Sequence, residues 1–196
     1  MQKTGVFGSA FNPPTQGHRD VLIQAAPHFD NILLVPSVAH AFHKKTLPLA
    51  KRVELLEAFC VDISSVFCKF EISLIESELL RTEPETPVYT WTVMDALSKQ
   101  YPDTTFSFIR GPDNANPEIW QRFYRYQDIE QRWPIFTAEE IVDARSSKVR
   151  EALASISLAK QSSRTPLPKQ LRTQLQKWLT PAVMALILEQ QLYYSP

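Results

Sequence analysis

The sequence predicts an α/β fold in which a parallel sheet carries helices on both faces. Apolar stretches of strand length alternate along the chain with stretches of helical spacing, a pattern typical of strand–helix–strand units. Residues 31–35 form a continuous, largely apolar run, which suits a parallel strand buried on both faces. Polar clusters follow four of the predicted strands, and ligands bind beyond the carboxyl ends of the strands in sheets of this kind.

The expected elements follow in chain order. Strands are expected at residues 4–8, 31–35, 68–74, 105–109 and 133–138. Helices are expected where apolar residues recur at helical spacing, at residues 17–26, 50–61, 90–100, 117–131 and 146–155. Ser146 or its neighbour is the expected cap of the last of these helices. Two short helices close the chain, the final one opening at Thr180 and Pro181, and residues 37–48 and 155–168 are expected to be loops.

Composition indicates one globular domain. The chain has 196 residues, of which 44% are hydrophobic and 21% charged, enough for a core. We expect a single domain, residues 1–196, with a core over 1–154 and a helical part over 168–196. The formal net charge is zero, which argues against nucleic acid and membrane surfaces as partners, because both demand a positive face.

The cysteine count and the N-terminus favour the cytoplasm. The only two cysteines, Cys60 and Cys68, are too few for a disulfide scaffold and are expected to be thiols. The N-terminal residues enter the first strand directly, and no apolar run approaches the length of a membrane span. The oligomeric state is left open.

Glycine is scarce, and its positions are informative. Three of the four glycines, Gly5, Gly8 and Gly17, fall within the first 17 residues, and the fourth is Gly111. Glycine permits close approach to the main chain, so each is expected to mark such an approach. The first three span a strand, a polar turn and a helix start, an arrangement whose free amides bind anions, most often phosphate.

Four polar segments are expected to meet at one edge of the sheet. They follow the first, second, fourth and fifth predicted strands, at residues 8–18, 40–45, 111–114 and 145–150. Because the carboxyl ends of parallel strands lie at the same edge, these segments are expected to form one phosphate-binding site.

The first motif, residues 7–18, reads Phe-Gly-Ser-Ala-Phe-Asn-Pro-Pro-Thr-Gln-Gly-His. By itself it is a capped helix start with a solvent-exposed histidine. It resembles the signature of the nucleotidylyltransferase superfamily, G-x-x-F-[DN]-P-x-[HT]-x-G-H. The resemblance implies that Gly17 lets a nucleotide lie against the turn while Thr15 and His18 donate hydrogen bonds to phosphate oxygens.

The second motif, residues 144–150, is a basic helix start, and such a start opposes the helix dipole unless an anion is bound. It resembles the superfamily pattern I-S-S-T-x-[IV]-R, in which hydroxyls, helix amides and the arginine hold the ATP phosphates. Ser146, Ser147 and Arg150 match this pattern, whereas Ala-Arg at positions 144–145 replaces the usual Ile-Ser.

Three further segments are similar to nicotinate mononucleotide adenylyltransferases. Residues 88–94 resemble S-Y-T-x-x-T-[ML], which closes over the pyridine ring, and residues 108–114 resemble F-I-[IL]-G-x-D-[SN]. Residues 120–129 resemble K-W-Y-x-[IW]-x-x-[IL], with Phe123 where the ring-stacking tryptophan stands and Tyr124 after it. Without the resemblance, these aromatic residues predict core packing.

The end of the chain and one loop extend the likeness. Residues 179–193 are similar to the family's terminal helix, a packing signature that the shorter phosphopantetheine adenylyltransferases do not share. His43 and Lys44 resemble the family's P-P-H-[KR] loop, which makes Lys44 a mobile charge over the triphosphate. His40 and His43 have the spacing of a metal pair only on a helix, and this segment is expected to be a loop.

These resemblances imply a Rossmann-like, doubly wound, five-stranded parallel sheet, the nucleotidylyltransferase fold, with C-terminal helices. They imply adenylyl transfer from ATP to nicotinate mononucleotide, giving deamido-NAD and pyrophosphate in NAD biosynthesis. The phosphate of the mononucleotide attacks in line without an enzyme nucleophile, and Mg²⁺ is the cofactor, held by ATP phosphates rather than by a protein metal site.

The resemblance assigns roles to individual residues. The implied catalytic residues are His18, Thr15, Lys44 and Arg150. The implied ATP-binding residues are Gly8, Ser9, Phe11, Gly17, His18, Gly111, Asp113, Ser146, Ser147 and Arg150. The implied mononucleotide-binding residues are Ala10, Asn12, Lys44, Tyr89, Thr90, Phe123 and Tyr124.

Three alternatives remain open at the level of sequence. The acceptor is nicotinamide mononucleotide instead of the acid, or it is phosphopantetheine, although the chain length and terminal helix argue against the second. The third alternative is a nucleotide-binding protein without catalysis, since the motifs depart from the pattern at several positions. Pyrophosphate release with each acceptor distinguishes all of them.

Overall fold

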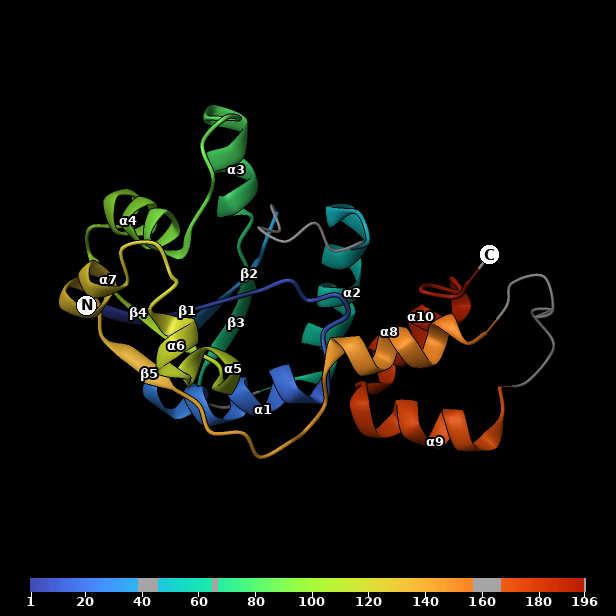
Figure 1. Ribbon diagram of the computed structural model, residues 1–196. Coiled ribbons are helices and arrows are strands. Elements are labelled where there is room, and N and C mark those ends of the chain that lie inside the picture. The colour runs from blue at the N-terminus through green and yellow to red at the C-terminus, as the bar shows by residue number, and fades with distance from the viewer. Residues whose placement is uncertain (39–45, 65–66, 157–166, 196) are drawn as a thin grey trace.

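The structure is a computed structural model that describes residues 1–38, 46–64, 67–156 and 167–195. Its centre is a parallel sheet of five strands in the order β3-β2-β1-β4-β5 (Figure 1). The strands are β1 (Gln2–Ser9), β2 (Asn31–Pro36), β3 (Lys69–Ile72), β4 (Thr104–Arg110) and β5 (Ile135–Thr137). The predicted α/β fold with a doubly wound parallel sheet is therefore confirmed.

The strand order creates a switch point beside β1. The chain runs outward from β1 to β2 and β3, then returns to place β4 on the other side of β1. Val6 of β1 is paired with both Leu33 of β2 and Phe108 of β4. A crevice opens beyond the carboxyl ends of the strands at such a reversal, so the end of β1 is where a ligand site is expected.

Helices connect the strands and cover the sheet (Figure 1). Those before β4 are α1 (Gln16–Ala25), the short 3₁₀ helix η1 (Ala26–His28), α2 (Leu49–Asp62), α3 (Ile75–Thr82) and α4 (Thr90–Gln100). Those after it are α5 (Pro112–Ala115), α6 (Pro117–Trp120), α7 (Tyr126–Arg132), α8 (Ser146–Ala154), α9 (Lys169–Trp178) and α10 (Pro181–Glu189).

Alternate residues of the strands build two separate cores. Phe7, Leu34 and Ile109 belong to a cluster with buried residues of α1, α2 and α8–α10. Their chain neighbours Val35 and Phe108 belong to a second cluster with residues of α3, α4, α6 and α7. Successive side chains of a strand point to opposite faces, so a nearly continuous apolar run serves both cores, as the sequence of β2 predicts.

Two predicted elements are wrong in detail. Residues 117–131 form two short helices instead of one, because the amides of Arg122 and Phe123 bond three residues back and Arg125 adopts a left-handed conformation with φ 54°. The segment 68–74 is a shorter strand, and the helix α3 that follows it was not predicted, since only Ile75 of its residues is buried.

The cap of α8 is Arg145, a neighbour of Ser146, and its side chain makes no capping bond. The Ser146 hydroxyl donates to the carbonyl of Pro13. The last helix does begin at Thr180 and Pro181 as expected, although the Thr180 hydroxyl makes no capping bond.

The C-terminal helices pack on the same core as the sheet. Leu175 of α9 and Val183 and Ile187 of α10 are fully buried in the cluster that contains the α1 face of the sheet. The amide of Ala182 donates to the Asp62 carboxylate at 2.6 Å, which ties α10 to α2. None of the helices in the described parts of the chain is long and apolar enough to cross a membrane.

Candidate nucleotide-binding site

The turn between β1 and α1 forms the floor of the candidate site. Phe11 is fully buried with φ 45°, and the Asn12–Pro13 peptide is cis. The buried guanidinium of Arg52 donates to the carbonyls of Ala10 and Ser37, each at 2.8 Å. Arg52 thus fixes the turn after β1 against the residue that follows β2.

His18 stands at the third position of α1 with a defined tautomer. The backbone amide of Thr15 donates to Nδ1 of His18 at 3.1 Å, as a glutamate does in a capping box. An amide only donates, so Nδ1 must be the unprotonated nitrogen of the neutral ring. The proton therefore resides on Nε2, which lies 3.0 Å from Oγ of Ser9.

Burial of the imidazole lowers the pKa of His18 to about 4, against a weaker opposing effect of the Asp113 carboxylate. The ring packs against Phe11, with centroids 5.0 Å apart, and against Phe7 at 6.1 Å. His18 is consequently neutral at physiological pH and presents one N–H donor, on Nε2, toward the end of β1.

The Thr15 hydroxyl already has a protein acceptor. Thr15 is fully buried, and its Oγ1 lies 2.8 Å from the Ala144 carbonyl and 2.9 Å from Nδ1 of His18. Because Nδ1 accepts from the backbone amide, we assign the hydroxyl proton to Ala144. Thr15 thereby joins the first motif to the second, and its implied contact with phosphate stays a prediction.

The four glycines divide into two kinds. A Cβ on Gly17 would lie 2.6 Å from the Ala144 carbonyl oxygen, and one on Gly5 would lie 2.5 Å from Ile109. A Cβ on Gly8 or Gly111 would meet nothing closer than 3.9 Å. At Gly17 the main chain is thus approached by the loop around Ala144, and not by a nucleotide as the sequence predicts. At Gly8 and Gly111 the main chain beside the site is not covered by other residues.

An extended segment from residue 138 to residue 145 carries the chain from β5 to α8. The side chain of Gln24 bonds to both the amide and the carbonyl of Glu139, each at 3.0 Å. The Asp20 carboxylate accepts from the amides of Ile141 and Val142, each at 3.3 Å. One face of α1 therefore positions the segment that delivers α8 to the site.

The first turns of α8 are bonded to the β1–α1 turn. Besides the hydrogen bond between Ser146 and Pro13, Nη1 of Arg150 donates to the carbonyl of Asn12 at 2.8 Å. The side chain of Asn12 in turn accepts from the hydroxyl of Tyr193 at 2.9 Å and from the amide of Leu47 at 3.3 Å. His18 and Arg150, 132 positions apart in the sequence, thus lie on one pocket.

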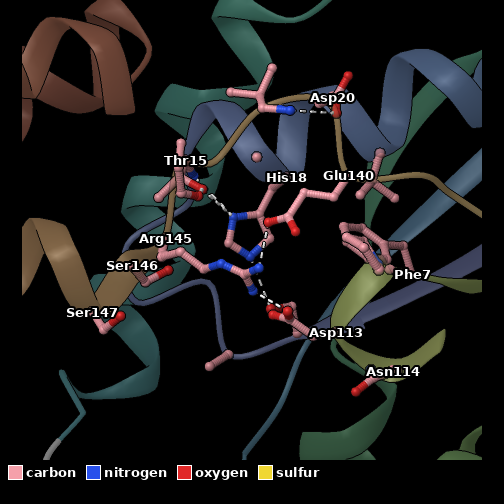
Figure 2. A pocket seen from close by; sticks show the side chains of 18 of the residues that line it. Phe7, Thr15, His18, Asp20, Asp113, Asn114, Glu140, Arg145, Ser146 and Ser147 are labelled. Carbon is pink, nitrogen blue, oxygen red and sulfur yellow. Dashed lines mark hydrogen bonds and ion pairs between the residues drawn. The ribbon is translucent and has the colours of Figure 1, made fainter. Parts of the chain in front are cut away.

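This pocket, with a volume of about 340 Å³, holds most of the predicted phosphate-binding residues (Figure 2). The predicted site residues that line it are Gly8, Ser9, Ala10, Asn12, Thr15, Gly17, His18, Gly111, Asp113, Ser146, Ser147 and Arg150. The predicted residues that do not line it are Phe11, Tyr89, Thr90, Phe123 and Tyr124. Lys44, together with His40 and His43, lies outside the described residues.

The aromatic residues assigned to the mononucleotide form a separate group. The rings of Tyr89 and Tyr124 stack with centroids 4.7 Å apart, and 40% and 49% of these residues is exposed. Phe123 is half-buried instead and packs on Trp120 at 4.8 Å and on Phe108 at 6.5 Å. Core packing, the alternative that the sequence left open, thus describes Phe123 but not the two tyrosines.

Three charged side chains of the pocket wall were not among the predicted site residues. Arg145 lines the pocket and forms ion pairs with Asp113 and Glu140, so that its side chain stretches across the site (Figure 2). Asp20 and Glu140 were not singled out, because isolated carboxylates on a helix or loop carry no motif. Arg145 belonged to the polar segment expected at the site, and it departs from the superfamily pattern, but it was not assigned a role.

Both cysteines are free thiols in the structure. Burial raises the pKa of Cys60 and of Cys68 to about 11, so neither is a reactive thiolate at neutral pH. No group of three or more histidine, cysteine or acidic side chains that would hold a metal ion occurs in the part of the chain that the structure describes.

Comparison with known proteins agrees with this geometry. The family model described as cytidylyltransferase-like matches residues 6–152. The nicotinate-nucleotide adenylyltransferase of Bacillus subtilis is 32% identical over 135 residues, which is 66% of this chain and 65% of that protein. A Leptospira interrogans protein assigned the same name is 26% identical over 65% of this chain and 60% of its own length. This chain thus matches less than two thirds of the length of these curated relatives.

Solved structures extend the likeness over the whole chain. A Vibrio parahaemolyticus protein assigned as a nicotinate-nucleotide adenylyltransferase superposes with a TM-score of 0.75 at 30% identity, covering 98% of this chain and 96% of that one. The Plasmodium falciparum nicotinic acid mononucleotide adenylyltransferase complexed with NaAD has a TM-score of 0.71 at 15% identity, covering 98% of each chain, which is a likeness of fold.

Proposed function

This chain belongs to the cytidylyltransferase-like family, and from that premise we propose that it transfers an adenylyl group from ATP to nicotinate mononucleotide. The products are deamido-NAD and pyrophosphate, and the reaction serves NAD biosynthesis. The names of its relatives support the choice of acceptor. The cytoplasmic location expected from the sequence stays a prediction.

The observation that carries the proposal is the meeting of two distant motifs on one pocket. Hydrogen bonds from Thr15 to Ala144, from Ser146 to Pro13 and from Arg150 to Asn12 join the β1–α1 turn to the start of α8. Both segments supply N–H and O–H donors at the switch point of a parallel sheet. Helix starts at such a point bind phosphate.

We infer that catalysis is by positioning and charge stabilisation. The mononucleotide phosphate attacks the α-phosphorus of ATP in line, the bond to the bridging oxygen breaks, and pyrophosphate leaves with its electron pair. His18, neutral and with its proton on Nε2, donates a hydrogen bond to the phosphoryl oxygen on which charge develops, giving up its contact with Ser9. It acts as a donor throughout and does not need to release its proton.

Residues of α8 are proposed to hold the leaving group. The hydroxyl of Ser147 is exposed to the pocket, and Arg150 uses one guanidinium nitrogen on the Asn12 carbonyl while its other N–H groups remain for pyrophosphate. Lys44 is proposed as a second cation over the same phosphates.

Mg²⁺ is proposed to accompany ATP. The carboxylate of Asp113 lines the pocket, and a hard oxygen donor of this kind fits a Mg²⁺ ion that is bound chiefly by phosphates and water. When bound, the ion neutralises charge on the phosphate oxygens.

Pyrophosphate release tests the proposal. The wild-type protein with ATP and Mg²⁺ is given nicotinate mononucleotide, nicotinamide mononucleotide or phosphopantetheine in parallel, and pyrophosphate is measured. We expect the fastest release with nicotinate mononucleotide. A higher kcat/KM with either other acceptor assigns a different substrate, and no release with any of them assigns a nucleotide-binding role without catalysis.

A further inference from the structure

Arg145 is the residue of the pocket wall that departs from the superfamily pattern. It caps α8 at the position where the superfamily pattern has serine, and 34% of its side chain is exposed. Its guanidinium forms ion pairs with Asp113, which follows β4, and with Glu140, which follows β5 (Figure 2). A third carboxylate, Asp143, lies 3.7 Å from its Nε. The side chain therefore spans the two segments that form the outer wall of the pocket.

Cations are outnumbered by carboxylates among the described residues that line the pocket. Among the described residues that line the pocket, the carboxylates are Asp20, Asp113, Glu139 and Glu140, and the guanidiniums are Arg145 and Arg150. His18 adds no positive charge, because its pKa is lowered. The triphosphate of ATP carries several negative charges, so a protein site for it needs its cations free to face the phosphates.

The backbone of Arg145 is anchored on both sides, while its side chain is held only near the surface. The carbonyl of Ala144 accepts from Thr15, and Ser146 donates to Pro13, each at 2.8 Å. In contrast, Asp113 and Glu140 expose 65% and 44% of their side chains, and exposed ion pairs of this kind contribute little to stability. The guanidinium is consequently free to exchange partners without moving α8.

We propose that Arg145 binds the triphosphate of ATP, its guanidinium exchanging the carboxylates of Asp113 and Glu140 for phosphate oxygens. The planar fork of arginine pairs with a phosphate through two parallel hydrogen bonds, which the serine hydroxyl of the superfamily pattern does not do. Arg145 thus joins Arg150, one and a half turns further along α8, as a phosphate ligand. The inference rests on the proposed function of this pocket as the ATP site.

Direct binding measurements test the inference. Wild type, Arg145→Ser and Lys148→Ser are titrated calorimetrically with ATP, with inorganic pyrophosphate and with adenosine, all in Mg²⁺. Lys148 is the matched control, because it lies on the same helix and is paired with Asp143, yet it does not line the pocket. We expect Arg145→Ser to weaken ATP and pyrophosphate binding at least tenfold, adenosine binding less than twofold, and Lys148→Ser to stay within threefold throughout.

The Kd for ATP of the Glu140→Gln variant distinguishes phosphate binding by Arg145 from a purely structural role of this residue. If Arg145 exchanges carboxylate for phosphate, removing the competing charge of Glu140 tightens ATP binding, and we expect a two- to fivefold lower Kd. If Arg145 only braces the wall, Glu140→Gln and Arg145→Ser weaken all three ligands together.

Two results would overturn the inference. One is an Arg145→Ser variant that binds ATP within twofold of wild type, and the other is a variant that binds ATP more tightly, which would make Arg145 an obstruction. These results are distinct from a failure of the proposed function, in which the wild type binds ATP and releases no pyrophosphate with any acceptor.

Discussion

The phosphate side of the pocket and the aromatic surface near α6 and α7 are built in different ways. On the phosphate side, buried or half-buried hydrogen bonds join segments more than 120 residues apart, as between Thr15 and Ala144. On the aromatic surface, the rings of Tyr89 and Tyr124 stack on each other, and a little under half of each residue is exposed. The first region has its geometry fixed by directional bonds, whereas the second is held by ring contact.

The difference teaches where this chain is constrained. A hydrogen bond requires a particular donor at a particular distance, so Thr15, Ser146 and Arg150 have little freedom to vary. A stacked ring requires only a flat apolar face, which phenylalanine, tyrosine or tryptophan provides. The departures from the family pattern at the aromatic surface are therefore milder in effect than a change at His18.

The largest expected effect is that of His18→Ala. It removes the Nε2 donor, and loss of one donor to developing charge typically lowers turnover about 10²–10³-fold. Steady-state pyrophosphate release measures the loss, and circular dichroism with thermal unfolding checks the fold, which we expect to change little. A variant that keeps more than half of the wild-type kcat contradicts the assignment.

Substitution by alanine is expected to lower the free energy of unfolding at Gly17 but to leave it nearly unchanged at Gly8. Gly17→Ala drives a Cβ against the Ala144 carbonyl, and overpacking of this kind costs about 1–3 kcal/mol of unfolding free energy. Gly8→Ala meets nothing closer than 3.9 Å, so we expect stability within about 0.5 kcal/mol of wild type, as for a surface change.

Urea denaturation of both glycine variants measures these free energies, and KM for ATP completes the comparison. Gly8→Ala is expected to raise KM although the fold is intact. Equal stability of the two variants would show that the loop does not approach Gly17 as closely as described.

The smallest effect is expected at the aromatic surface. Tyr124→Ala removes one stacked ring, and a stacking contact is worth about 0.5–1.5 kcal/mol beyond its buried area, or about two- to tenfold in KM for the mononucleotide. Tyr101→Ala is the matched control, an equally exposed tyrosine at the C-terminal end of α4 that is not among the predicted site residues. Identical KM values for the two variants would remove Tyr124 from the binding surface.

Much of the fold could be predicted from the sequence because local pattern and tertiary structure agree. The run at residues 31–35 became the buried strand β2, and the alternation of strands and helices gave the parallel sheet. The break after Trp120 could not be predicted, since it depends on the packing of Trp120 and Phe123 against Phe108. The same holds for α3, which has little buried surface to impose an apolar period.

The sequence motifs identified many residues that line the pocket, but not the long-range contacts that hold these residues in place. Sequence motifs named the residues around His18 and α8, which share one pocket. They did not predict that Gly17 leaves room for the close approach of the Ala144 carbonyl. They also did not predict that Asp20 and Gln24 position the segment before α8. Such contacts join residues more than 100 positions apart and leave no local pattern.

The bond between Tyr193 and Asn12 has a consequence for how the protein matures. Synthesis proceeds from the N-terminus, so the β1–α1 turn leaves the ribosome long before α10. The acceptor oxygen of Asn12 gains its 2.9 Å partner only when the final helix has docked. The turn is thus synthesised 181 positions before the residue that donates to it, and we expect competence to bind nucleotide to arise only after residues 181–193 have been made and have docked.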